Sequence, residues 1–423
     1  MTPEERHRKL QEIAAHVVER LEQEWPAADA HVNELEDLAE RVGRELMREV
    51  SETLLRERAP RREGNQTACA CGGRADYRGD QWLTLVTAHG RIPVERAYFY
   101  CAHCRSGHCP RDRQWGLGPA HTTPTVQALV ADCAAEIAYT KVPRWLRRLR
   151  LPIHLGVKSV EEMAQRLGER VQAAPPAVKT AATRPLAAAV DGVMLPTRDG
   201  YKEARSGVIY EPDWDAGRTP EECGALRKEY VGTLESRESL VQAVAARVEQ
   251  RRPTPQTKVA ALGDGAHWIW EQYALHLPER VEILDFYHVC EHLGQVAGAW
   301  HGAGTPAAAH WVKGMKEALL TEGPGPLLRS LAAWQPESEG AREVQRQEVG
   351  YFSGNQERMN YPEYLRLGFP IGSGAVEGAC KHLVSERFKK TGMRWNKATA
   401  EPLLHLRAAL LTEPDLDLRR YVS

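Results

Sequence analysis

The segment Leu186-Ala-Ala-Ala-Val-Asp-Gly192 predicts a buried strand that ends in a carboxylate, and Val259-Ala-Ala-Leu-Gly-Asp-Gly265 predicts a second one. Short apolar runs bounded by turn residues are typical of strands inside a sheet, and open sheets place their sites at the carboxyl ends of such strands. We therefore expect Asp191 and Asp264 to lie together at one edge of a sheet. A single Asp-Gly pair is weak evidence because both residues favour turns, and Asp199-Gly200 is expected to be only a turn.

A third acid, Glu377, lies in the segment Gly372-Ser-Gly-Ala-Val-Glu-Gly-Ala-Cys-Lys381. This segment predicts a helix with Glu377 just inside its start and Ser373 as its N-cap. Carboxylates from two strands and one helix can bind two Mg²⁺ ions about 3.5–4 Å apart, with Mn²⁺ as the alternative ion. The three acids therefore predict a divalent-metal site that activates a water or a hydroxyl nucleophile.

The chain around these acids predicts alternating strands and helices: three strands, a helix, a strand, a helix and a strand. The small and proline-rich residues 173–185 predict a linker before the first strand. Residues 293–370 are predicted to be helical. The remaining strands are expected at Ala204–Tyr210, Glu229–Leu234 and Val281–Leu284, and a helix at Glu238–Gln250.

Two cysteine pairs precede the linker, at the ends of a predicted β-hairpin. They can bring four thiolates around one tetrahedral Zn²⁺ ion, and the glycines after each pair allow the turns that this requires. Nine cysteines in a chain without a predicted secretion signal favour metal binding over disulfides. We expect a structural zinc ribbon, with a redox or incidental cysteine cluster as the alternative. The expected ligands are Cys69, Cys71, Cys101 and Cys104, with Cys109, His103 and His108 as substitutes for one of them.

Residues 123–171 predict a helical block that carries five basic residues and no acid between Lys141 and Arg150. Ser159 and Glu162 fit a capping box, so a second helix is expected to begin at Ser159. Helix, turn and capped helix outline a helix-turn-helix whose second helix would enter the DNA major groove. A plain three-helix packing unit is the alternative. The basic side chains expected to contact DNA here are Arg144, Arg147 and Arg148.

Residues 4–25 and 30–58 predict two helices broken at Pro26, in a region where residues 1–60 hold 15 acids against nine Lys and Arg. Apolar residues spaced by three and four form one stripe on the second helix. The stripe is either an oligomerisation seam or the face of a helical hairpin packed on its own chain. Its members are Leu35, Leu38, Val42, Leu46, Val50 and Leu54.

The whole chain has 423 residues, is 42% apolar and 27% charged, and carries a net charge of −1. This composition fits roughly two to four globular domains and excludes a collagen, a disordered chain and a small disulfide scaffold. No apolar run approaches the length of about 18 residues that a membrane span needs, and the first 25 residues lack the apolar core of a secretion signal. We therefore expect a cytoplasmic protein that is not associated with a membrane.

Four longer motifs are more specific than any single acid. They are Asp264-Gly-Ala-His-Trp-Ile-Trp270, Ile283-Leu-Asp-Phe-Tyr-His-Val-Cys-Glu-His292, Pro370-Ile-Gly-Ser-Gly-Ala-Val-Glu377 and Gly392-Met-Arg-Trp-Asn396. With these motifs the chain resembles the ISKra-type insertion-sequence transposases, which belong to the Mutator-like group of DDE transposases. The resemblance covers nearly the whole chain, including the cysteine pairs, and it is not specific in the acidic first 60 residues. It implies a prokaryotic protein that is associated with the nucleoid.

The resemblance implies an RNase H-like core in which the three acids named above form the catalytic, metal-binding triad. It also implies that residues 293–370 are a helical insertion between the fifth strand and the Glu-bearing helix. Asp285 and His288 match an Asp-x-x-His element that similar enzymes carry after the fifth strand. His288 is then expected to orient a phosphate or the nucleophile, with Asp285 fixing its tautomer and His292 on the same helix face. A buried Asp–His pair that ties the sheet to the insertion is the alternative.

Residues 381–397 hold six basic residues against one acid and are the expected DNA-binding part of the core. The helix that begins near Glu377 is expected to bind metal at its start and DNA backbone toward its end. A base stacked on Trp395 is one expectation, and core packing of this Trp is the other. Tyr351, Asn355, Arg358 and Tyr361 of the insertion are further DNA-facing candidates. The expected contacts of the core are Lys381, Arg387, Lys389, Lys390, Arg394 and Trp395.

Together these features predict a Mg²⁺-dependent DNA transposase that cuts at transposon ends and joins the freed 3′-hydroxyl to target DNA. Its partners would be the terminal inverted repeats, the target DNA and further copies of itself, in a homodimer or a higher synaptic oligomer. The first alternative is an RNase H-like nuclease without strand transfer. The second is a zinc-containing DNA-binding regulator in which the acidic trio is inert.

The predicted fold class is a multi-domain α+β protein. The predicted parts are an N-terminal helical region at 1–60, a zinc-ribbon-like domain at 61–112, a helix-turn-helix-like DNA-binding domain at 113–172, the linker at 173–185, the RNase H-like core at 186–292 and 371–423, and the all-helical insertion at 293–370.

Overall fold

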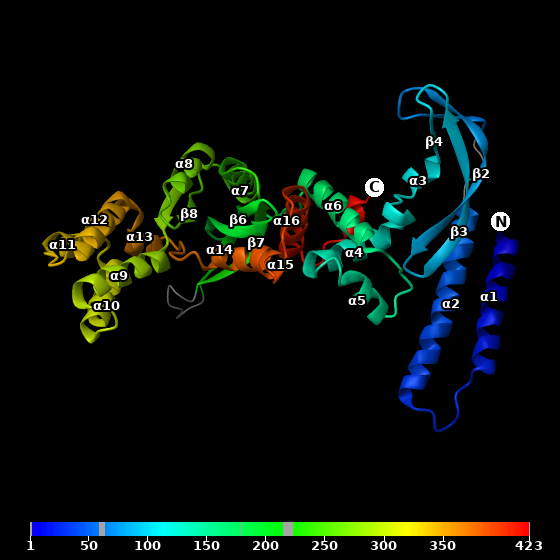
Figure 1. Cartoon of the computed structure of the whole chain (residues 1–423), viewed down its shortest axis with the longest axis horizontal. Helices are drawn as coiled ribbons and strands as arrows, with labels where there is room; N and C mark the ends of the chain where they lie inside the picture. The colour runs from blue at the N-terminus through cyan, green and yellow to red at the C-terminus, as the bar shows by residue number, and fades with distance from the viewer. Residues whose placement is uncertain (1, 59–63, 179, 215–222, 423) are drawn as a thin grey trace. The chain divides into compact units, whose positions relative to one another are not determined.

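The computed structural model describes residues 2–58, 64–178, 180–214 and 223–422, and its elements are labelled in Figure 1. The chain is a mixed α+β protein with 54% helix and 20% strand, which confirms the predicted class. It divides into two compact units. Residues up to Leu167 together with 417–422 form the first unit, and Gly168–Leu416 form the second.

The first unit begins with a helical hairpin of α1 (Pro3–Gln23) and α2 (Val32–Arg58). In these two helices, which are described in full, the buried side chains are Ile13, Leu38 and Val42. Two members of the predicted stripe remain exposed, Leu35 at 46% and Leu54 at 53%. The middle of the stripe therefore packs within the hairpin, and its ends face solvent.

A four-stranded antiparallel sheet follows, in the order β1-β2-β3-β4. Its long strands form the predicted hairpin, and Thr87 pairs with Gly90 across the turn. The short outer strands flank the hairpin at the end that carries the cysteine pairs. The strands are β1 (Gln66–Ala68), β2 (Arg74–Thr87), β3 (Gly90–Cys101) and β4 (Ser106–His108).

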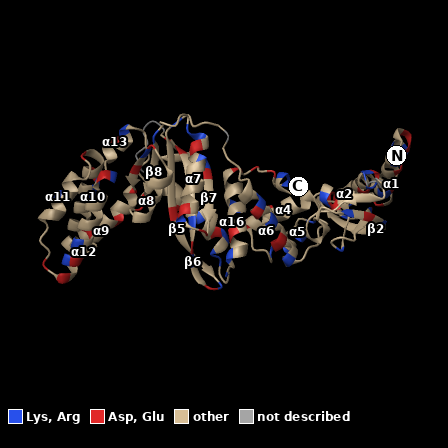
Figure 2. Cartoon of the chain, turned by 90° about the horizontal axis from the view of Figure 1, so that it is seen from above, with Lys and Arg blue, Asp and Glu red and all other residues tan. Residues whose placement is uncertain are grey.

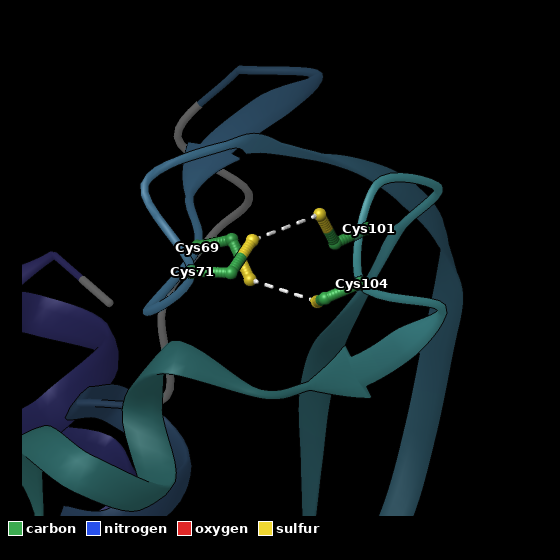
Figure 3. A group of neighbouring side chains, drawn as sticks. All are labelled: Cys69, Cys71, Cys101 and Cys104. Carbon is green, nitrogen blue, oxygen red and sulfur yellow. Dashed lines mark hydrogen bonds between the residues drawn. The ribbon is translucent and has the colours of Figure 1, made fainter.

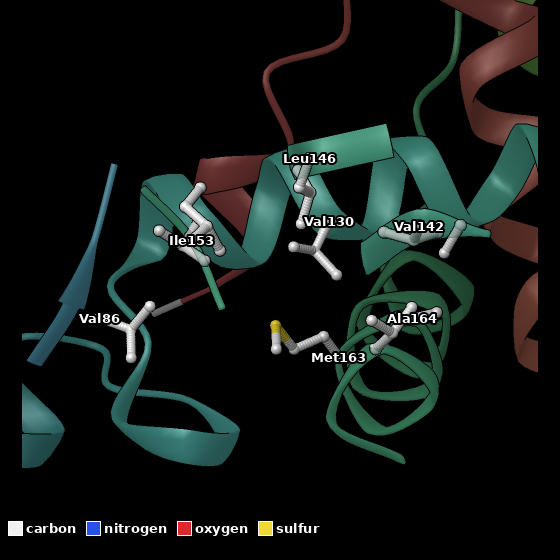
Figure 4. Packing of buried hydrophobic residues seen from close by; sticks show 10 residues of the cluster. Val86, Val130, Val142, Leu146, Ile153, Met163 and Ala164 are labelled. Carbon is white, nitrogen blue, oxygen red and sulfur yellow. The ribbon is translucent and has the colours of Figure 1, made fainter. Parts of the chain in front are cut away.

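The predicted helical block follows this sheet, and it encloses an apolar core (Figure 4). Its elements are α3 (Pro110–Gln114), η1 (Pro119–His121), α4 (Pro124–Glu136), α5 (Val142–Arg148) and α6 (Val157–Ala173). The core includes Val86, Val130, Val142, Leu146, Ile153, Met163 and Ala164. Because Val86 belongs to β2, the helices share this core with the sheet.

The start of α6 differs from the prediction. The helix begins at Val157, and the N–H of Val160 donates to the carbonyl of Gly156 at 3.2 Å. Its first turn therefore closes two residues before Ser159. The predicted capping box at Ser159 and Glu162 is wrong, because Ser159 already lies inside the helix.

The second unit is built on a five-stranded sheet in the order β7-β6-β5-β8-β9. The first three strands are antiparallel, and β8 and β9 continue the sheet parallel to β5. Each predicted strand is present, and Asp199 lies in the predicted turn between β5 and β6. The strands are β5 (Leu186–Thr197), β6 (Gly200–Asp213), β7 (Gly224–Thr233), β8 (Val259–Gly263) and β9 (Arg280–Leu284).

Helices cover both faces of this sheet (Figure 1). On one face Gly207 of β6 lies against Val244 of α7, and on the other Gly232 of β7 lies against Leu404 of α16. The first face is covered by α7 (Arg237–Arg251) and α8 (His267–His276). The second is covered by α14 (Gly374–Ala379), the π-helical η4 (Cys380–Ser385), α15 (Glu386–Phe388) and α16 (Lys397–Thr412).

A block of helices stands between β9 and α14, as predicted for residues 293–370, although its first helix already begins at Phe286. Arg358 Nε donates to Glu282 Oε2 of β9 at 2.7 Å, and the Tyr361 hydroxyl donates to the Leu284 carbonyl at 3.0 Å. Tyr361 and Asn355 are buried, so the prediction that these residues face DNA is wrong. The helices are α9 (Phe286–His301), α10 (Pro306–Thr321), α11 (Gly325–Ala333), α12 (Glu339–Gly354), η3 (Gln356–Arg358) and α13 (Tyr361–Arg366).

Two predicted boundaries differ from the observed units. The first unit ends at Leu167, inside α6, whereas the helical domain was predicted to end at 172. Residues 417–422 also belong to the first unit, whereas they were predicted as the end of the core. The physical reason is that η5 (Leu418–Tyr421) packs against α4 of that unit.

A fully buried ionic network ties α7 to β6 and β7. The Arg251 guanidinium donates to Glu211 Oε1 at 2.7 Å and to the Arg227 carbonyl at 2.7 Å. Glu229 Oε1 lies 3.4 Å from Arg251, and all three charged side chains are 0% exposed. Burial raises the pKa of Glu229, and the charges of Arg251 and Arg247 oppose this rise. Removing one partner would leave a buried charge without compensation.

We expect Arg251→Leu to lower the free energy of unfolding by about 3–5 kcal/mol, because the buried carboxylates of Glu211 and Glu229 lose their ion pair with the Arg251 guanidinium. Urea unfolding followed by circular dichroism measures this loss. The matched control is Arg346→Leu, which removes an exposed pair with Glu343 and should unfold like the wild type. Equal unfolding midpoints for the two variants would contradict a stabilising role of the network.

Candidate functional site

Four cysteine side chains converge at one end of the β2–β3 hairpin (Figure 3). Cys69 Sγ lies 3.6 Å from Cys104 Sγ, and Cys71 Sγ lies 3.7 Å from Cys101 Sγ. All four sulfurs lie within 4.8 Å of one another. Sulfurs bound tetrahedrally at about 2.3 Å are about 3.8 Å apart, so the observed spacing suits a metal ion. The predicted cysteine group is confirmed as one that could hold a metal, and the predicted substitutes do not belong to it.

The local backbone explains why these cysteines meet. Gly72 has a φ of 84° and donates its N–H to the Cys69 carbonyl at 3.0 Å, which closes a tight turn around the first pair. Cys101 pairs with Ser106 across β3 and β4, so the second pair lies in a turn as well.

Hydrogen bonds with the Ser106 hydroxyl, 2.9 Å from Cys104 Sγ, with the Ser106 backbone and with the neighbouring thiols lower the pKa of Cys104 to about 6. Against a backbone hydrogen bond that lowers it, the contacts among the thiols raise the pKa of Cys71 to about 12. A thiolate is the form of cysteine that binds metal.

Asp191 and Asp264 lie side by side at the carboxyl ends of β5 and β8. The register pairs Ala189 with Leu262, so the two acids, each two residues further along, occupy equivalent positions on neighbouring parallel strands. Such strands are about 4.8 Å apart, and residues in register point to the same face. Burial, and to a smaller extent the charge of Asp264, raises the pKa of Asp191. The predicted neighbourhood of the two carboxylates is thus present.

Both acids point to the sheet face that carries the Glu-bearing helix. Asp191 pairs with Ser206, and Ser206 pairs with Gly232, which lies against η4 and α16. Helix α14, which contains Glu377, contacts β5 and β6 on this face. Glu377 itself is exposed. The sheet and the helix therefore bring all three acids to one side of the second unit.

Cys380 joins Asp191 to this helix. Its thiol donates to Asp191 Oδ2 at 3.6 Å, and burial raises the pKa of Cys380 to about 12, so it stays a neutral donor. Cys380 follows Glu377 by three residues, and residues at this spacing share one helix face. Glu377 is near enough to Cys380 for its charge to contribute to the raised pKa of that thiol. Cys380 was not singled out from the sequence, although its spacing of three residues from Glu377 was an available signal.

The start of the Glu-bearing helix differs from the prediction. Ser373 stands at the N-cap of α14, but its side chain makes no capping hydrogen bond. Its backbone N–H instead donates to Asp285 Oδ2 at 2.9 Å. After α14 the chain continues as the π-helical η4 and not as one α-helix. π-Helical turns are rare and frequently occur at functional sites.

The Asp285 carboxylate binds backbone N–H groups. Oδ1 accepts from Tyr287 at 2.6 Å and from His288 at 3.1 Å, and Oδ2 accepts from Ser373. Asp285 therefore caps α9 and anchors the loop that leads to Glu377. The prediction that it fixes the His288 tautomer is wrong, because its hydrogen bonds go to main-chain groups. Burial raises the pKa of Asp285, and these three N–H groups oppose the rise.

His288 lies on the exposed side of α9, with 37% of its side chain accessible. Its Nδ1 is 3.4 Å from Glu291 Oε2, and its ring centroid is 5.0 Å from that of His292. The predicted shared face of the two histidines is confirmed. The aromatic ring of Tyr351, from α12, lies 6.3 Å from His288 and stacks on His292.

The three acids form a wider group than the cysteines. Among the residues that the structure describes, only the four cysteines bring three or more metal-binding atoms within 4.8 Å of one another. Two Mg²⁺ ions about 3.5–4 Å apart, each about 2.1 Å from its ligands, accommodate carboxylates separated by more than this distance.

The basic residues after Glu377 fall into two groups. Arg387 and Trp395 are only 1% and 7% exposed, and their side chains stack with the guanidinium 5.0 Å from the ring centroid. The Trp395 indole donates to the Phe388 carbonyl at 3.0 Å. The prediction that these two residues contact DNA is wrong, because they form the core under the helix. The exposed residues are Lys381, Lys389, Lys390 and Arg394.

In the first unit the basic surface lies on α5. Arg144, Arg147 and Arg148 are exposed, and Trp145 between them is 43% exposed. Across both units basic and acidic residues are mixed (Figure 2), and the accessible side of α6 follows this mixed pattern. The first helix of the predicted pair, α5, thus carries the more uniform positive charge.

Neither a protein-family model nor a curated protein matches this chain. Within the described residues, no helix is both long and apolar enough to cross a membrane.

Proposed function

We propose that this chain is a metal-dependent DNA transposase of the DDE type, with an RNase H-like catalytic core in its second unit. The observation that carries the proposal is the register of β5 and β8, which puts Asp191 and Asp264 on the face that α14 covers. The order of strands and helices in this unit, three strands, a helix, a strand, a helix and a strand, agrees with the order predicted from the sequence and supports the proposal. Three carboxylates from two strands and one helix are the donor set that such an enzyme needs.

The proposed reaction uses one site twice. Water first attacks the phosphorus at a transposon end, the P–O3′ bond breaks, and the transposon keeps a free 3′-hydroxyl while the flanking DNA keeps the 5′-phosphate. The 3′-oxygen then attacks a target phosphorus, forms a new P–O3′ bond and displaces the target 3′-hydroxyl. Two Mg²⁺ ions, when bound, activate the attacking oxygen and stabilise the leaving one. Asp191, Asp264 and Glu377 would hold them, and His288 would orient a phosphate.

The four cysteines would hold one structural Zn²⁺ ion, and the first unit would bind the transposon ends. We infer that α5, and not the second helix of the predicted pair, provides the phosphate contacts of this unit. Its exposed arginines have no acid among them, and Trp145 offers an aromatic face for stacking. Two ends need two active sites, so we propose a dimer or a larger synaptic assembly.

We expect the triple variant Arg144→Ala, Arg147→Ala and Arg148→Ala to bind DNA with a smaller dependence on salt. Each lost phosphate contact lowers the slope of log K against log salt by about 0.9 on duplex DNA, so the slope should fall by roughly 2–3. Fluorescence anisotropy at several salt concentrations measures it. Arg166→Ala on α6 is the control, and an equal change of slope there would contradict the assignment to α5.

A strand-transfer assay tests the proposed function. The purified chain is incubated in Mg²⁺ with 3′-hydroxyl DNA ends taken from both sides of its own reading frame and with a supercoiled target plasmid. We expect joined products that depend on Asp264. A nuclease would nick the plasmid without joining, and an inert regulator would bind the ends without changing either DNA.

A further inference from the structure

Tyr351 of α12 reaches from the helical insertion to the acidic site. Its hydroxyl donates to the main-chain carbonyl of Asp264 at 2.9 Å. The hydroxyl of Tyr351 therefore contacts the backbone of the turn that carries Asp264.

The turn after Asp264 is shaped around this ring. Gly265 has a φ of 98°, a conformation that side chains rarely adopt, and a Cβ there would come within 2.7 Å of Tyr351 Cε2. The Asp264 carboxylate folds back in the same turn and accepts from the Ala266 N–H at 2.9 Å. The direction of the carboxylate thus depends on a turn that packs directly against Tyr351.

Two further residues hold the Tyr351 ring in place. His292 of α9 stacks on it with a centroid distance of 3.9 Å and an interplanar angle of 12°. His292 Nδ1 lies 2.7 Å from Glu348 Oε2, and Glu348 is 4% exposed. Glu348 is one helical turn before Tyr351 on α12, so the pair and the ring form one connected set between α9, α12 and the end of β8.

We propose that Tyr351 is a positioning residue that holds the Asp264 turn in its metal-binding form and so couples the helical insertion to the acidic site. The inference rests on the proposed metal site. Without the Tyr351 hydroxyl, the main-chain carbonyl of Asp264 loses this hydrogen bond. The turn is then held less firmly, and the Asp264 carboxylate adopts more orientations. Metal binding then weakens, although no metal ligand has been removed.

Direct binding of Mn²⁺, measured by the loss of its free electron paramagnetic resonance signal on titration, tests this role. Tyr351→Phe keeps the ring that stacks on His292 and removes only the hydroxyl. We expect its Mn²⁺ dissociation constant to rise roughly three- to tenfold, the effect of one lost hydrogen bond. Tyr364→Phe is the matched control, because the Tyr364 hydroxyl also donates to carbonyls, those of Glu357 and Glu282, away from the acids.

The controls separate this inference from the proposed function. Suppose that the wild type binds Mn²⁺ and that Asp264→Asn abolishes this binding. If Tyr351→Phe then binds Mn²⁺ as tightly as the wild type, or no more weakly than Tyr364→Phe, the role of Tyr351 is refuted while the metal site stands. If the wild type shows no Asp264-dependent binding, the metal site and the coupling are both refuted. Equal thermal unfolding of the two Tyr variants shows that a weakened affinity in Tyr351→Phe is not a loss of fold.

Discussion

We expect the Asp264→Asn variant to fold like the wild type and to join no detectable DNA ends. Asn keeps the side-chain oxygen that accepts from Ala266 N–H at 2.9 Å, so the turn survives. It removes the charge that would hold the metal ions beside Asp191. Removal of a single stabilising group from such a site costs about 10²–10³-fold in rate, and loss of a metal ligand should exceed this. Strand-transfer yield in Mg²⁺ is the measurement.

The chain supplies its own control for this substitution. Asp199 is also followed by a glycine, but it lies in the exposed turn between β5 and β6. Asp199→Asn therefore makes the same chemical change outside the acidic site and should leave strand transfer at the wild-type level. Activity retained in Asp264→Asn, or lost equally in both variants, would contradict the role given to Asp264.

The second large effect is expected at the cysteine cluster. Replacement of Cys71 or Cys104 by Ser should abolish metal binding there and unfold the tip of the β2–β3 hairpin. Outside the ligands, the core at this end of the sheet consists of Ala75, Ala97 and Phe99, with Tyr77 partly buried against them. A core of this size does not fold on its own, and structural zinc contributes on the order of 10 kcal/mol in zinc-finger peptides.

Metal analysis of the purified chain measures this effect. We expect one zinc per wild-type chain, none in the Cys variants, and rapid amide hydrogen exchange in β1 and β4 once the metal is lost. Cys133→Ala is the control, because Cys133 packs against the helical core of the same unit and is not part of the cluster. A wild-type chain without zinc, or Cys71→Ser with a full zinc content, would show that the cluster is not a metal site.

Strand positions could be predicted from sequence because each strand is a short apolar run with a clear end. The runs before Asp191 and Asp264 are buried almost completely, and this leaves a pattern that local reasoning can detect. The cysteine group was likewise predictable, because a hairpin brings its two ends together and each end carries a close pair of cysteines. In both cases the signal lies within a few neighbouring residues.

The residues that were predicted wrongly depend on contacts between distant parts of the chain. Arg387 and Trp395 belong to a basic segment, yet both are buried because the chain around Trp395 pairs with the end of β5. Asp285 sits in a motif that suggests a histidine partner, yet its second oxygen binds the N–H of Ser373, 88 residues later. Periodicity and charge cannot reveal such contacts, because both are local properties of the sequence.

The contributions of Cys380 and Tyr351 were missed for the same reason. Cys380 appears as one of several scattered cysteines, and only the fold brings its thiol to Asp191. Tyr351 was predicted to face DNA, whereas its hydroxyl reaches the carbonyl of Asp264. Each of these side chains contacts one of the predicted acids or its backbone, and neither contact follows from a local pattern in the sequence.

Anomalous diffraction from a crystal soaked in Mn²⁺ tests the proposed active site most directly. We expect two anomalous peaks about 3.5–4 Å apart, bounded by the carboxylates of Asp191, Asp264 and Glu377. No peak beside Asp191 and Asp264, or peaks there with Glu377 turned away from them, would contradict the assignment of these three residues to one catalytic site.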